Sequence, residues 1–131
     1  MNTSATNIDE VLATFDESWA PRLLATVEGR SVKLARLDGT FVWHTHEDTD
    51  ELFLVLSGTI EIGIRDDGNT HFVRLGPKDV YVVPRGVEHR PSADAEAVVL
   101  LIERAGTLST GDFAGETPDH ITSTRGISAG L

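Results

Sequence analysis

The fifteen residues from His44 to Gly58 constrain the fold of this chain more than any other stretch. They place two histidines with one residue between them and then, after four intervening residues, Glu51. Side chains of an extended chain alternate faces with a period of two, so His44 and His46 should point to the same side. The polar segment between His46 and Glu51 is rich in turn-forming residues and can return the chain beside its first strand. The pattern therefore predicts three metal-ligand side chains on one wall of a β structure.

A second segment supplies a fourth donor. Residues 84–89, Pro-Arg-Gly-Val-Glu-His, follow the strand-like run 80–83 and present one more imidazole after a Pro/Gly turn. Three imidazoles and a carboxylate form a mixed nitrogen and oxygen set that suits a divalent transition metal. The predicted metal ligands are His44, His46, Glu51 and His89.

Two motifs carry a family resemblance: His44-x-His46-x4-Glu51-x6-Gly58 and Pro84-x-Gly86-x2-His89. They resemble the two signature motifs of the cupin superfamily. More narrowly, residues 19–111 resemble the small single-domain bacterial cupins described as RmlC-like or mannose-6-phosphate isomerase-like. The resemblance implies a double-stranded β-helix, or jelly-roll barrel, with the four predicted ligands around one metal.

Three residues depart from the general motifs of that family: Asp38, Lys78 and Ala93. None of these positions is a metal ligand in the family, so the metal-site prediction is unaffected. The departures give no basis for assigning the chain to one particular cupin enzyme.

Short apolar runs separated by Gly, Pro and Asp predict an all-β sandwich or barrel. The expected strands are residues 22–27, 31–37, 40–46, 52–56, 59–64, 71–75, 80–83 and 97–103, with a turn at residues 38–39. Before them, Asn7 is a candidate N-cap of a short helix that ends before Pro21 and packs outside the sheets. Its apolar stripe is Ile8, Val11, Leu12, Phe15 and Trp19.

The expected organisation is one domain with two flanking segments. Residues 1–18 carry the helix, residues 19–112 form the cupin domain, and residues 113–131 form a flexible tail. Twelve of the twenty-five residues from Thr107 to Leu131 are Gly, Ser or Thr, a composition with few apolar groups to order it. The first part of this segment, residues 107–112, resembles a stretch that follows the last strand of small cupins and is expected to pack.

The composition limits which binding partners and which cellular compartment are expected. The chain has no cysteine, which excludes disulfides and thiolate metal sites and is compatible with a reducing cytoplasm. Eleven basic and twenty-one acidic residues give a formal charge of -10, which disfavours nucleic acid and anionic membrane surfaces as partners. The N-terminus shows neither a basic start nor an apolar signal core, so a cytoplasmic protein is expected.

The leading functional hypothesis is a metal-dependent enzyme of isomerase, lyase or dioxygenase type acting on a small oxygen-rich metabolite. Its cofactor would be one divalent metal per chain, with zinc, iron, nickel and manganese left open. The alternative is a non-catalytic module that binds a small molecule or a metal, and a third reading is a barrel with an empty site. No catalytic residue is assigned, and Tyr81 and Arg36 are weak candidates for proton transfer. Glu88 and Arg90 beside His89 are interpreted as solvated turn charges, and His71 and His120 as solvated histidines.

A homodimer is also expected, formed through sheet edges or through residues 52–56. Residues 52–56 are apolar at every position, which predicts a strand buried on both faces. Its outer face would then pack against the helix or a second copy of the chain, and Trp43 should face outward as well.

Overall fold

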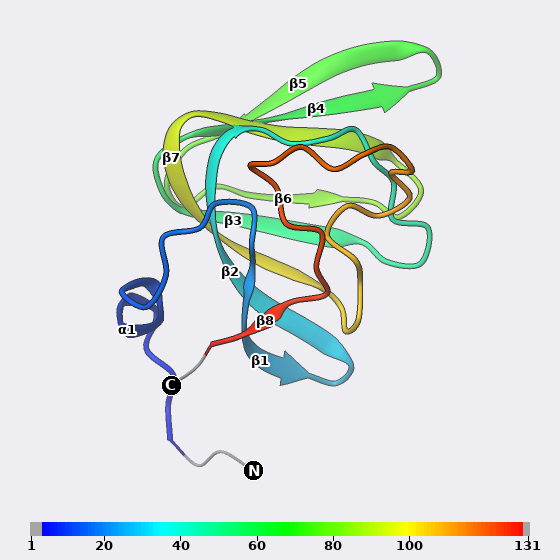
Figure 1. Ribbon diagram of the computed structural model, residues 1–131. Helices are drawn as coiled ribbons and strands as arrows, with labels where there is room; N and C mark the ends of the chain where they lie inside the picture. The colour runs from blue at the N-terminus through cyan, green and yellow to red at the C-terminus, as the bar shows by residue number, and fades with distance from the viewer. Residues whose placement is uncertain (1–3, 130–131) are drawn as a thin grey trace.

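The computed structural model describes residues 4–129 as a β barrel with one short helix on its outside (Figure 1). The elements are α1 (Ile8–Leu12), β1 (Arg22–Val27), β2 (Arg30–Thr40), β3 (Glu51–Ser57), β4 (Ile60–Asp66), β5 (Asn69–Leu75), β6 (Val80–Val83), β7 (Glu88–Arg104) and β8 (Ile127–Ser128). The strands are hydrogen-bonded in the order β5-β4-β7-β2-β1-β8, and β3 pairs with both β6 and β7. The all-β prediction with a short N-terminal helix is confirmed.

The long strand β7 holds the barrel together. Its first half pairs with β4, and its second half pairs with β2 on one side and β3 on the other. The sequence predicted a strand only for residues 97–103, whereas the structure begins it at Glu88. The predicted turn at residues 38–39 is also replaced by a bulge, where residues 94–96 of β7 lie opposite the single residue Asp38 of β2. A bulge bends the strand while keeping the ladder on both sides of it, so β2 and β7 can curve together around the barrel.

Two apolar clusters form the core, one inside the barrel and one under α1. In the outer cluster Val11 of the helix packs with Leu34 and Val98 of the sheet. Asn7 accepts a hydrogen bond from the backbone nitrogen of Glu10 at 3.0 Å, as expected of an N-cap. The predicted helix on the outer face of the sheets is therefore confirmed. Within residues 4–129, no helix is long and apolar enough to cross a membrane.

The helix is shorter than the apolar spacing predicted, because its last expected residue belongs to the barrel interior. Trp19 has a left-handed backbone with φ of 58°, which turns the chain inward after the helical segment. Its ring stacks on Phe41 with 4.8 Å between centroids, and its Nε1 donates to the carbonyl oxygen of Asp38 at 2.8 Å. Burial of a large aromatic ring inside the barrel outweighs continuation of a short helix.

The C-terminal segment differs from the flexible tail that its composition predicted. Residues 105–126 cross the front of the barrel (Figure 1), and β8 pairs in parallel with β1. Ile121 is buried in the inner core, and Thr110 bonds Ser123 through their hydroxyls at 2.7 Å. The segment is held by one apolar anchor and by side-chain hydroxyls, which satisfy the polar groups of a non-strand backbone.

Replacing Gly58 with alanine is expected to lower the free energy of unfolding by about 3 kcal/mol, as the combined cost of backbone strain and overpacking. Gly58 has φ of +79°, and a Cβ there would lie 2.9 Å from the Cα of Ala97 on β7. The matched control is Gly68→Ala, because Gly68 has φ of +78° with nothing within 4 Å of the added methyl. Urea unfolding of both variants measures the difference, and equal losses would show that the close approach to Ala97 costs nothing.

Candidate metal centre

Two of the four predicted donor residues face each other directly. His44 and His89 form an isolated antiparallel bridge in which each backbone nitrogen donates to the other's carbonyl oxygen, at 3.0 and 2.9 Å. Residues 41–46 are not a continuous strand as predicted, so this bridge fixes the place of His44 in the barrel wall. The two imidazole rings lie 4.2 Å apart between centroids. Both rings are buried, with exposed fractions of 3% and 1%.

The other two donors approach from either side of this pair. His46 follows two residues later, and its carbonyl oxygen accepts a hydrogen bond at 2.9 Å from Gly86 in the turn before β7. Glu51 opens β3 and sends its Oε1 to within 3.1 Å of His89 Nε2 and 3.7 Å of His46 Nε2. One ligand atom from each of the four residues lies within 4.8 Å of the others. The structure therefore brings together all four residues that the sequence singled out.

The backbone orients two of the imidazoles for a ligand inside the barrel. His44 Nδ1 contacts the carbonyl oxygen of Val42, and His89 Nδ1 contacts that of Val87, each at 2.9 Å. A carbonyl oxygen only accepts hydrogen bonds, so Nδ1 carries the proton in both rings. In a neutral imidazole this leaves the lone pair on Nε2, the nitrogen that points into the cluster.

A further observation fits a cation among these donors. Within the described residues, the buried Nε2 atom of His46 has no hydrogen-bond partner. Leaving a buried polar nitrogen unsatisfied is costly, and coordination of a metal would satisfy it. Three imidazole nitrogens and one carboxylate are a donor set that suits a transition metal rather than magnesium or calcium.

The electrostatic environment keeps the donors in the form that a metal requires. Burial lowers the pKa of His44 to about 3, and burial also lowers the pKa of His46. Burial opposes the charge of Glu51, but its hydrogen bond with His89 and the nearby imidazoles hold its pKa well below the usual range. For His89 the hydrogen bond and charge of Glu51 outweigh burial and raise the pKa. A metal would therefore meet an ionised carboxylate and displace at most the proton shared between Glu51 and His89.

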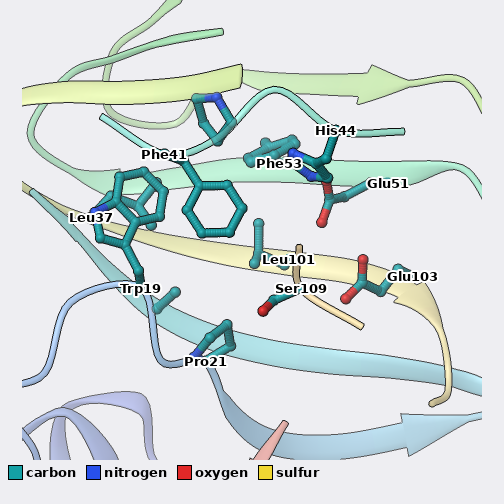
Figure 2. A pocket seen from close by; sticks show the side chains of 12 residues that line it. Trp19, Pro21, Leu37, Phe41, His44, Glu51, Phe53, Leu101, Glu103 and Ser109 are labelled. Carbon is teal, nitrogen blue, oxygen red and sulfur yellow. The ribbon is translucent and has the colours of Figure 1, made fainter. Parts of the chain in front are cut away.

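A small cavity lies beside the cluster, inside the barrel (Figure 2). Trp19 and Phe41 form one end of it, while Glu51 and Glu103 extend their carboxylates at the other end. The remaining lining is mostly apolar and includes Phe53, Leu101, Leu37, Ala35 and the two prolines Pro21 and Pro91. Its volume is about 30 Å³, which is space for one or two water molecules. A metal held by the four donors would thus have a narrow, enclosed space next to it.

The Cupin_2 family model, which describes a cupin domain, matches residues 26–103 of the chain. The chain belongs to the cupin family. The matched range begins within β1, ends one residue before the end of β7, and contains all four clustered donor residues.

Related cupins agree with this assignment. A cupin-2 domain protein from Shewanella frigidimarina has 38% sequence identity and a TM-score of 0.70, with 76% of this chain and 93% of that one covered. The uncharacterized protein YdbB of Bacillus subtilis is 34% identical over 61% of this chain and 68% of its own length. Plant auxin-binding and germin-like proteins also match, and this cupin spans between 32% and 54% of their length.

A more distant neighbour shares the fold alone. Hydroquinone 1,2-dioxygenase from Sphingomonas sp. TTNP3, in complex with 4-nitrophenol, has 23% sequence identity and a TM-score of 0.69. The comparison covers 77% of this cupin and 32% of the dioxygenase chain.

The sequence prediction missed a buried ion pair next to the cluster. Lys33 Nζ lies 2.9 Å from Glu103 Oε1, and both side chains are almost fully buried. Burial and the neighbouring Glu51 carboxylate raise the pKa of Glu103 to about 9, against the opposing charge of Lys33. The sequence could have indicated the burial of Glu103. Alternation along the strand places it on the same face as the inward-facing Val99 and Leu101.

The weaker candidates for proton transfer do not lie in the cluster. Arg36 donates to the carbonyl oxygens of Phe15 and Leu12 and so ties the helical segment to the sheet. Tyr81 is half-buried and packs against the inner core.

The two charges flanking His89 face away from the donor cluster. Glu88 pairs with Arg65 at 3.5 Å, and Arg90 lies over the ring of Trp43 at 4.9 Å. Trp43 packs between these arginines rather than against the helix, with Arg65 at 3.8 Å from its ring centroid.

The free energy of unfolding of the metal-free protein is expected to be greatest near pH 6, because the proton that native Glu103 keeps above its ordinary pKa of 4.5 offsets part of the His44 effect. Below that pH, His44 becomes protonated in the unfolded chain but stays neutral in the native state down to about pH 3. Stability therefore falls as pH falls. Above it the native state retains protons on His89 and Glu103 that the unfolded chain has released, so stability falls as pH rises toward about 9. Each proton of difference changes the free energy by about 1.4 kcal/mol per pH unit. Urea unfolding with a chelator present tests this, and a steady rise in stability above pH 6.5 would contradict it.

Proposed function

We propose that this cupin is a metal-dependent enzyme acting on a small oxygen-rich molecule, with His44, His46, Glu51 and His89 holding one divalent transition metal. The observation that carries the proposal is the convergence of four buried donors, one of them an unsatisfied imidazole nitrogen, beside an internal cavity. A metal with four protein ligands retains open positions when its geometry is octahedral. When bound there, it would polarise a substrate oxygen or acidify a bound water.

The chain's own residues have distinct parts in this proposal. The carbonyl oxygens of Val42 and Val87 hold two imidazoles in the tautomer that presents Nε2. The apolar cavity wall excludes bulk water and so strengthens charge interactions near the donors. Glu103 lies at the polar end of the cavity, where it can accept or donate a hydrogen bond to a substrate hydroxyl.

Dioxygenase chemistry is one of three reaction types compatible with such a centre, together with isomerase and lyase chemistry. A neighbour with the same fold is a hydroquinone 1,2-dioxygenase whose structure holds 4-nitrophenol. This neighbour suggests which substrates to test. Its sequence identity is too low to assign the reaction.

The test is turnover by protein reconstituted separately with iron, manganese, nickel and zinc. Dihydroxylated aromatics, hydroxy acids and phosphorylated sugars are supplied under air and under nitrogen, with product formation followed by mass spectrometry. Oxygen-dependent turnover selects the dioxygenase type, and oxygen-independent turnover selects the isomerase or lyase type. Absence of turnover with every metal contradicts the enzyme proposal.

A non-catalytic module that binds a metal or a small molecule is the second candidate. Some plant relatives are named auxin-binding proteins, which favours a ligand-binding role for a similar chain. Tight binding of a small molecule with no product formed would select this candidate.

We further propose that a second copy of the chain covers the outer face of β3 and β6. Val80 and Val82 on the edge strand β6 are 55% and 42% exposed, although both are large and apolar. The groove beside them is lined by residues of both charge signs, including Arg30, Arg85 and Asp50. A face with both signs can pair with itself across a twofold axis.

Static light scattering at micromolar concentration is expected to give twice the chain mass of 14.2 kDa. Val82→Asp should give the monomer mass, because a charge would be buried in the interface. Phe72→Asp is the matched control, since Phe72 is 59% exposed on β5, away from this face. A monomer mass for the unmodified protein would refute the dimer.

A further inference from the structure

The segment that carries His44 and His46 makes few backbone hydrogen bonds to neighbouring strands. His44 is bridged to His89, and the carbonyl oxygen of His46 is bonded by Gly86, but Thr45 between them belongs to no strand. Both polar groups of the Thr45 backbone are instead bonded by Asp112. Its Oδ1 accepts from the Thr45 nitrogen at 2.6 Å, and its backbone nitrogen donates to the Thr45 carbonyl oxygen at 3.2 Å.

The neighbouring Gly111 lies directly against the two histidines. A Cβ at this position would overlap the carbonyl oxygen of Thr45. It would also lie 3.1 Å from His44 Cδ2 and 3.2 Å from His46 Nδ1. Only glycine lets the backbone approach the rings this closely, so the chain at Gly111 forms a wall behind both imidazoles.

The two residues before Gly111 are themselves hydrogen-bonded to a later part of the chain. Ser109 donates through its backbone nitrogen to Thr124 at 2.8 Å, and its hydroxyl accepts from the Thr124 nitrogen at 3.0 Å. Thr110 is buried and bonds Ser123. Residues 109–112, termed the strap here, are therefore fixed between the donor-bearing segment and the outer residues 122–124.

We propose that Gly111 and Asp112 are positioning residues of the metal centre, which hold His44 and His46 at the separation needed for one ion. The inference rests on the proposed metal site. Neither residue is among the four clustered donors, and their contacts are to the Thr45 backbone and to the imidazole rings. Loss of the strap contacts should leave all four donors in the chain but increase the freedom of two of them. Outer partners of ligating residues commonly change metal affinity by about 10- to 100-fold when they are removed.

Zinc affinity is measured by competition with a chromophoric chelator, and the visible spectrum of the cobalt(II)-loaded protein reports ligand geometry. Asp112→Ala is expected to weaken zinc binding by about 10- to 100-fold and to alter the cobalt spectrum. Asp112→Asn keeps an oxygen that can accept from the Thr45 nitrogen, so it should stay within about threefold of the unmodified protein. Asp119→Ala removes an exposed carboxylate from the same segment and should change neither readout.

Two glycine variants separate the effect of close packing from the effect of backbone strain. Gly111 has φ of +52° and Gly106 has φ of +84°, but a Cβ at Gly106 meets nothing within 4 Å. Gly111→Ala should therefore weaken zinc binding, as Asp112→Ala does, whereas Gly106→Ala should retain it. Circular dichroism and urea unfolding identify any variant that fails to fold, and Asp112→Ala tests the inference without introducing a steric clash.

The outcomes distinguish this inference from the proposed function. If the unmodified protein binds zinc and cobalt and Asp112→Ala matches it in both readouts, the positioning role is refuted while the metal site stands. If Asp112→Asn is as impaired as Asp112→Ala, the charge of Asp112 is responsible and positioning by its hydrogen bond is refuted. If the unmodified protein binds neither metal, the metal site fails and the positioning role fails with it.

Discussion

His89→Ala is expected to abolish stoichiometric metal binding. The apparent free energy of a four-ligand transition-metal site is about 10–16 kcal/mol, so one ligand accounts for roughly 3 kcal/mol and a loss of more than about 100-fold in affinity. The loss should be larger at this position, because the imidazole of His89 also hydrogen-bonds Glu51, another of the four donors. His46→Ala should also abolish stoichiometric metal binding, and both variants retain the backbone bridge between residues 44 and 89.

Elemental analysis of protein produced without a histidine tag measures the metal content. The matched control is His71→Ala, because His71 is an exposed histidine on β5 and lies outside the cluster. One metal ion per chain in the unmodified protein and in the control, with none in the two cluster variants, is the expected result. Full metal content in His89→Ala would show that the metal lies elsewhere, and the enzyme proposal would lose its basis.

The clustering of the four donor residues could be predicted because their spacing follows strand parity and turns, which are local properties of the chain. The two histidines one residue apart and Glu51 after a polar turn needed no knowledge of distant residues. The detailed route differed from the prediction, since residues 41–46 are not a regular strand. A single bridge to His89 holds His44 in the barrel wall, where a continuous strand was expected to hold it.

The parts that the sequence did not reveal depend on contacts between distant residues. The composition of residues 113–131 predicted a flexible tail, because local composition does not report which carbonyl a serine or threonine will reach. The hydroxyl of Ser109 meets residues 122–124, and the backbone of Asp112 meets Thr45, sixty-seven residues away. Such pairs are specified only after the barrel has formed.

The ion pair of Lys33 and Glu103 joins residues seventy positions apart, and the expected effect of breaking it is among the largest in the molecule. Lys33→Met is expected to lower the free energy of unfolding by about 3 kcal/mol at neutral pH. Removing one partner leaves a buried acid without its cation, close to the carboxylate of Glu51. The pKa of Glu103 is already raised to about 9 with Lys33 present, so at neutral pH the variant leaves an unsatisfied buried carboxyl rather than a bare charge, and this sets the estimate at the lower end for buried pairs.

The double variant Lys33→Met/Glu103→Leu should recover most of the lost stability, because two apolar side chains of similar size can replace a buried ion pair at little net cost. Lys78→Met is the matched control: Lys78 is the other lysine of the chain, it is exposed, and its replacement should change stability by less than about 0.5 kcal/mol. Urea unfolding of the unmodified protein, Lys33→Met, Glu103→Leu and the double variant gives the coupling energy between the two partners. A double variant as unstable as Lys33→Met would mean that the loss comes from packing around the lysine stem rather than from an unpaired acid, so the ion pair itself would not be what stabilises the wall behind Glu51.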